Sequence, residues 1–150
     1  RLAAERGAAP ELIQGAKDLL SAIDRALADT AAVDFGAYVS LNAEFHELIS
    51  AMSGSDIVMR EVARVSRLPL ASPSAFLQEQ ELIPDFIASL LRAQGQHRSI
   101  LEAICNREGA RAEALAREHA RLARSNFAYL SKAEPSVTRK IPGLSLIAPA

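Results

Sequence analysis

This 150-residue chain contains one cysteine, no tryptophan and no long apolar run. Because a single cysteine, Cys105, cannot form a disulfide within the chain, we expect a reducing compartment, namely the cytoplasm. No apolar run approaches the roughly 18 residues of a membrane-spanning helix, so we expect no membrane partner. Alternating runs of β-branched residues are also absent, which argues against a β-sheet fold.

The chain has no excess of charge of either sign. Lys and Arg number 17 against 18 Asp and Glu, which gives a formal net charge of −1. A surface that wraps nucleic acid needs a basic face, so we do not expect these residues to bind DNA themselves. With 49% apolar and 23% charged residues, the composition is that of a folded chain. The length predicts one domain, which buries roughly 70% of its surface on folding.

Helical periodicity runs through almost the whole chain, and short connections join the helical segments. We therefore predict an all-α fold, an antiparallel bundle of six to seven helices. The expected helical segments are residues 1–8, 10–28, 34–52, 56–68, 78–105 and 108–131. Asp34 is expected to cap the third segment, and Asn106 to end the fifth in the left-handed conformation. Pro84 either kinks the fifth segment or marks its true start.

The last residues differ in composition from the rest of the chain. We interpret residues 1–132 as one helical domain and residues 133–150 as an irregular tail, because prolines and a glycine recur in the tail. The chain begins at Arg1 rather than at a methionine and has no signal-peptide pattern. We therefore expect further residues upstream.

Three histidines lie on three different predicted helices, each in phase with apolar residues. His97 is in the middle of the apolar stripe of its helix, and His119 is at the centre of another. Asn42 and His46 lie one turn apart at the edge of a third stripe. Two interpretations are open. Each histidine is a core residue with its own hydrogen bond, or all three share a divalent metal such as zinc, nickel, copper or iron, with an Asn42 oxygen as a further ligand.

The segments that carry these residues resemble a known family. Residues 41–54, LNAEFHELISAMSG, are similar to its motif Asp/Asn-x-x-Phe-His-x-x-Ile followed by Ser-Gly. Residues 96–104, QHRSILEAI, resemble its Glu-His-x-x-Ile-x-x-Ala-Ile, and residues 114–119 resemble a later motif that ends in histidine. The opening residues 1–4, RLAA, are also similar. The family is the C-terminal effector-binding (FCD) domain of the FadR group of GntR-type transcription regulators, and the likeness covers roughly residues 1–131.

The resemblance implies a helical bundle around a central cavity for a ligand and a metal. When the metal ligands of the family are matched to this sequence, they fall on Asn42, His46, His97 and His119. The expected cofactor is one divalent transition metal, zinc or nickel. The family more often has aspartate where Asn42 stands, and a neutral amide binds a cation less strongly. The implied partners are a small carboxylate effector, a second copy in a homodimer, and operator DNA through an upstream winged helix-turn-helix domain.

Other polar residues give weaker signals. Asn126 shares the inward face of His119, and it either orients a ligand or makes a hydrogen bond in the core. Cys105 is expected to be buried at the end of an apolar stripe. Three arginines between residues 60 and 67 lie opposite three valines, which predicts a solvated arginine face.

A metal-dependent enzyme acting on a small organic acid is the alternative function. His46-Glu47 begins like a zinc-protease motif, but the second histidine is missing. The sequence has no Glu-x-x-His pair, no Gly-rich phosphate loop and no nucleophile elbow. Glu44 and Glu102 remain as candidate general bases. A dimerisation module without a ligand is a third possibility, but it leaves the histidines unexplained. We therefore predict an effector-sensing domain and not an enzyme.

Overall fold

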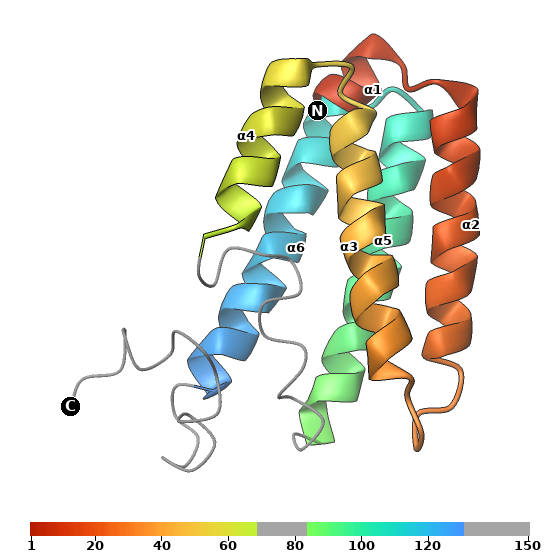
Figure 1. Ribbon diagram of the computed structural model, residues 1–150, viewed down its shortest axis with the longest axis vertical. Helices are drawn as coiled ribbons and strands as arrows, with labels where there is room; N and C mark the ends of the chain where they lie inside the picture. Colours follow the sequence, from red (N-terminus) through yellow and green to blue (C-terminus); the bar gives the residue numbers. More distant parts are fainter. Residues whose placement is uncertain (69–83, 131–150) are drawn as a thin grey trace, which may run out of the picture.

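The computed structural model describes residues 1–68 and 84–130, with side chains for residues 1–68 and 86–122. The described residues form six helices, which Figure 1 labels: α1 (Leu2–Arg6), α2 (Pro10–Ala26), α3 (Phe35–Ala51), α4 (Asp56–Ser66), α5 (Pro84–Cys105) and α6 (Gly109–Leu130). The described residues contain no strand, and the all-α prediction is confirmed. The predicted tail, residues 133–150, and the first part of the predicted fifth segment, residues 78–83, lie outside the described ranges.

Two antiparallel helical hairpins form the body of the molecule (Figure 1). One consists of α2 and α3 and the other of α5 and α6, and α2 also packs against α5. The short helix α1 crosses one end of the bundle, where it packs against α5 and α6. The remaining helix, α4, packs against α3. This arrangement leaves one side of α3 directed at the second hairpin.

Helices α3 and α4 each begin at a residue whose side chain accepts a hydrogen bond from a backbone N–H of the first turn. The Asp34 carboxylate accepts a hydrogen bond of 2.9 Å from the backbone nitrogen of Ala37, as predicted for the start of α3. The Ser55 hydroxyl accepts one from the backbone nitrogen of Val58 at the start of α4. Pro10 occupies the first turn of α2, where its missing N–H would have no partner within the helix.

The connection between α5 and α6 differs from the prediction by one position. Arg107, and not Asn106, adopts the positive φ of 61°. The backbone nitrogen of Arg107 donates to the Ile104 oxygen at 3.0 Å, and that of Glu108 donates to the Ala103 oxygen at 2.9 Å. In this hydrogen-bond pattern the left-handed residue is the one after the helix cap. Asn106 is therefore the cap itself, and the prediction for it was wrong.

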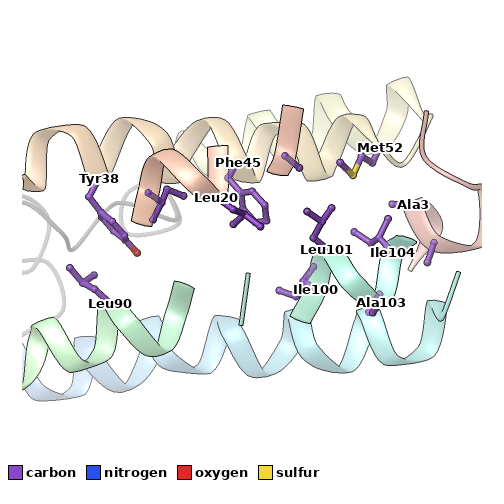
Figure 2. Packing of buried hydrophobic residues seen from close by; sticks show 14 of the residues in the cluster. Ala3, Leu20, Tyr38, Phe45, Met52, Leu90, Ile100, Leu101, Ala103 and Ile104 are labelled. Carbon is purple, nitrogen blue, oxygen red and sulfur yellow. The ribbon is translucent and has the colours of Figure 1, made fainter. Parts of the chain in front are cut away.

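The apolar core runs along the space between the two hairpins. Figure 2 shows Tyr38 and Phe45 of α3, with Met52 just past its end, on one side and Leu90 and Leu101 of α5 on the other. All five side chains are buried, and the stripe predicted on α5 is buried along its length. The burial of Tyr38 was not predicted from the sequence. Its side chain extends the core toward the beginning of α3.

Cys105, which we expected inside the core, lies outside it. Cys105 is exposed, because it follows Ile104 by one residue and is therefore rotated about 100° away from the buried stripe. Ala116 of α6 is also exposed. Close packing of α6 involves α5 and α1, so its buried face is narrower than the sequence pattern indicates.

The most exposed helix is α4, which has no buried residue. Its arginines are exposed, as predicted, but the apolar side opposite them is exposed as well, with Val62 at 43% and Val65 at 42%. Ile57 of α4, and Leu68 just past the end of this helix, are also exposed. None of the described helices has both the length and the apolar character that crossing a bilayer requires.

Candidate metal centre

The three histidines meet where α3 faces the second hairpin. His46 comes from α3, His97 from α5 and His119 from α6. The ring centroids lie 4.4 Å apart for His97 and His119, 5.2 Å for His46 and His97, and 5.3 Å for His46 and His119. One nitrogen from each ring lies within 4.8 Å of the other two. No carboxylate or thiol from the described part of the chain joins this group.

Burial differs among the three rings. His97 has no exposed surface and packs against the ring of Phe45, with centroids 4.7 Å apart. His46 and His119 are half-buried. The centre therefore has a closed side at His97 and a more open side at the other two rings.

Hydrogen bonds hold the two rings of the second hairpin. His97 Nδ1 lies 3.1 Å from Oε1 of Gln94, and His119 Nδ1 lies 3.1 Å from Oε1 of Gln96. The Nε2 atoms of His97 and His119 face each other at 3.1 Å. Both rings thus bond outward through Nδ1 and present Nε2 to the centre of the cluster.

Burial keeps the cluster uncharged at neutral pH. It lowers the pKa of His46 to about 4, with a further decrease from the nearby His119. It lowers the pKa of His97 to about 2, and His119, His46 and Arg98 add to the decrease. Burial also lowers the pKa of His119. Neutral imidazole is the form that binds metal, so the cluster has no proton to lose before binding.

The donor set fits one divalent ion. Two nitrogens bound to one metal at about 2.1 Å in tetrahedral positions lie about 3.4 Å apart. The separation between His97 Nε2 and His119 Nε2 is 3.1 Å, close to that value. Three imidazoles are borderline ligands, which suit zinc, nickel, copper or iron better than calcium or magnesium.

A comparison with protein-family models finds the FCD domain over residues 1–122. The chain belongs to the FCD domain family. The FCD domain is the effector-binding domain of GntR-type regulators, which are regulatory proteins. A comparison with curated proteins finds no match.

The other predicted site residues of this FCD domain do not belong to the group of three histidines. Asn42 is buried on α3, one turn before His46. Asn126 lies on α6, but its side chain is outside the described part. The candidate bases Glu44 and Glu102 are exposed, and Glu102 pairs with Arg111 at 3.3 Å. Neither carboxylate joins the histidine cluster.

Two polar residues beside the histidine cluster, and one on the same helix as His46, were not predicted from the sequence. Gln94 and Gln96 bind the outer nitrogens of two histidines, and Ser50 lies one turn after His46. Its hydroxyl is buried, and no hydrogen-bond partner for it is found among the described residues. A signal for Gln94 was present, because it falls within the apolar stripe of α5, where a polar residue needs a partner.

Proposed function

We propose that this FCD domain is the effector-sensing and dimerisation domain of a GntR-type regulator of the FadR group. Its effector is a small carboxylate bound at a divalent metal, zinc or nickel. The metal ligands are Asn42, His46, His97 and His119. The observation that carries the proposal is the convergence of three neutral imidazoles from three different helices on one point.

The charge of the ligand set is the reason to expect an anion. When bound, the metal supplies a cationic coordination position for a ligand oxygen. Asn42 and the three imidazoles are neutral, so they leave the charge of the ion uncompensated. A carboxylate gains a coordination bond and charge neutralisation in a low-dielectric interior. The buried Ser50 hydroxyl supports a polar ligand in this region, because a buried hydroxyl normally has a partner.

Regulation follows from linkage between effector and DNA. An effector that binds one arrangement of the two hairpins more tightly favours that arrangement. In a homodimer with upstream winged helix-turn-helix domains, the favoured arrangement sets the spacing of the two DNA-binding units in the cytoplasm. A coupling of about 1–3 kcal/mol changes the affinity for operator DNA by about 5- to 150-fold.

Metal analysis tests the ligand set. We expect the purified protein to contain about one equivalent of zinc or nickel, and His97→Ala to lose it, because no other ring replaces His97 in the cluster. Cys105→Ser is the matched control, since it removes the exposed thiol that could bind metal adventitiously. Retention of metal in His97→Ala together with its loss in Cys105→Ser contradicts the proposal.

Calorimetry tests the effector. A panel of small carboxylates is titrated into the metal-loaded protein and into the protein treated with chelator. Binding is expected only to the loaded form, and Ser50→Ala is expected to weaken it without loss of metal. Equal binding to both forms means that the metal has a structural role and does not bind the effector.

Turnover separates the proposed sensor from the metal-dependent enzyme. A sensor binds the acid and releases it unchanged, whereas an enzyme needs a general base beside the metal. The two carboxylates that could serve as bases, Glu44 and Glu102, are exposed and outside the cluster. We expect no product when the metal-loaded protein is incubated with each carboxylate that binds.

A further inference from the structure

The orientation of the Gln94 side-chain amide follows from the atoms around it. Gln94 is buried, and its Nε2 lies 2.9 Å from the Leu20 carbonyl oxygen and 2.9 Å from Asp24 Oδ1. Both oxygens only accept hydrogen bonds, so they require the NH2 end of the amide. The other end, Oε1, is therefore the atom directed at His97 Nδ1, 3.1 Å away.

This orientation determines the tautomer of His97. An amide oxygen only accepts, so the His97 Nδ1 beside it carries the proton. A neutral imidazole has a single ring proton, and Nε2 of His97 is left with its lone pair. The Leu20 carbonyl oxygen of α2 thus fixes the orientation of the Gln94 amide, and this amide fixes which nitrogen of His97 carries the proton.

The facing ring repeats part of this arrangement. His119 Nδ1 lies beside Gln96 Oε1, and its Nε2 faces Nε2 of His97 at 3.1 Å. Two lone pairs at this distance repel each other unless a proton or a cation lies between them. Gln96 is half-buried, and among the described residues no hydrogen bond of its amide nitrogen decides its orientation, so that part of the chain constrains His119 less than His97.

We propose that Gln94 is a positioning residue that holds His97 in the Nδ1–H tautomer and thereby makes Nε2 the atom available to a metal. Asp24 extends this constraint to α2, because one carboxylate oxygen accepts from Gln94 and the other from Arg98. The role of His97 Nε2 in metal binding rests on the proposed function. The tautomer of His97 is a property of the metal-free protein and is independent of that function.

Nitrogen-15 NMR of the metal-free protein tests the tautomer directly. In protein labelled at histidine, at a pH where the rings are neutral, we expect His97 to show a protonated Nδ1 and an unprotonated Nε2. Addition of zinc is expected to shift the Nε2 resonance of His97 and to leave its Nδ1 protonated. A protonated Nε2 on His97 in the metal-free protein overturns the proposal.

Variants of Gln94 test its role. Gln94→Leu removes the acceptor, so His97 is expected to lose its exclusive Nδ1–H form and zinc affinity to fall by about 10- to 100-fold. Arg6→Met is the control, since Arg6 binds the carbonyl oxygens of Ser53 and Gly54 and no histidine.

The outcomes keep the two proposals apart. If the wild-type protein binds no metal but His97 is Nδ1–H and Gln94→Leu changes that, the tautomer assignment stands and the proposed metal function fails. If zinc binds and Gln94→Leu changes neither the tautomer nor the affinity, the metal function stands and Gln94 is only a packing residue. An equal loss of zinc affinity in Arg6→Met means that the effect comes from general destabilisation.

Discussion

Asn42, for which the resemblance implies that an aspartate is more common, would set the charge of the proposed centre. It is buried on α3, one turn before His46. With an amide there, every proposed ligand is neutral, and the charge of a bound ion is left for the effector to neutralise. With a carboxylate there, the protein itself would neutralise part of that charge.

The substitution Asn42→Asp separates these two effects. We expect it to tighten metal binding, because a carboxylate attracts a cation more strongly than an amide does. We expect the same change to weaken carboxylate binding, since the added negative charge opposes that of the effector. Calorimetry with zinc and then with the carboxylate panel measures both affinities. If Asn42→Asp tightens both, the charge argument is wrong even if the ligand set is right.

The buried histidines also make stability depend on pH in the metal-free protein. The pKa is lowered to about 4 for His46 and to about 2 for His97, whereas an unfolded histidine has a pKa of about 6.5. Below pH 6.5 the unfolded chain therefore binds more protons than the folded one. The free energy of unfolding is expected to be constant above pH 6.5 and to fall below it, by up to about 1.4 kcal/mol per pH unit for each proton taken up on unfolding.

Urea unfolding between pH 8 and pH 5, with a chelator present, measures this dependence. His46→Asn is the matched variant, because it replaces one titrating ring by a neutral polar side chain. Its stability is expected to fall less steeply between pH 7 and pH 5 than that of the wild type. Parallel curves for the two proteins would mean that His46 does not contribute.

At the scale of elements, the link between α5 and α6 depends on an arginine in a conformation that usually favours glycine. Arg107 has a φ of 61°, and its guanidinium donates to the Glu5 carbonyl oxygen at 2.9 Å. A Cβ on Gly7 would lie 3.1 Å from Nη1 of Arg107, so the absence of that atom makes room for the guanidinium. The contact joins α1 to the turn of the second hairpin and compensates for the unfavourable backbone conformation.

Two substitutions at Arg107 separate the free-energy cost of its left-handed backbone conformation from the loss of its hydrogen bond to Glu5. Both Arg107→Ala and Arg107→Gly lose the bond to Glu5, but only alanine keeps a Cβ in the left-handed region. We therefore expect Arg107→Ala to be the less stable by about 1 kcal/mol. Thermal or urea unfolding of the two variants gives the difference. Equal stabilities would mean that the turn relaxes to a different conformation.

Most of the helices could be predicted because their determinants are local. Asp34 is the cap predicted for α3, and Pro10 is in the first turn of α2, both set by neighbours in the sequence. Cys105 and Arg107 could not be predicted in the same way. Their positions depend on where the last turn of α5 ends relative to α1 and α6, which is a property of the tertiary packing.

At the scale of the whole molecule, the candidate centre joins the two hairpins. Inward phase on three helices correctly predicted that His46, His97 and His119 point to a common interior. The hydrogen-bond partners could not be predicted, because Leu20 and Asp24 reach Gln94 from α2, more than 60 positions earlier in the chain. Periodicity places a residue on a face, but it does not say which helix covers that face.

A homodimer of this FCD domain needs an apolar surface, and α4 presents one. We expect association through the exposed side of α4 that carries Val62 and Val65, because dimer interfaces have an apolar centre. Val62→Lys combined with Val65→Lys is expected to give a monomer at tens of micromolar in sedimentation experiments. The matched control, Arg60→Ser with Arg64→Ser, changes the opposite side of α4 and is expected to leave the dimer intact. A wild-type monomer at that concentration contradicts the prediction.

The complete burial of His97 has a consequence for how fast the centre would exchange its contents. His46 and His119 are only half-buried, so water and competing ligands would approach the centre from their side and not from the side of His97. An ion held by the three rings would therefore leave on the side of His46 and His119, with its bond to His97 the last to break. Its loss would not require the two hairpins to separate, and it would become faster as the amount of scavenger in the surroundings increases.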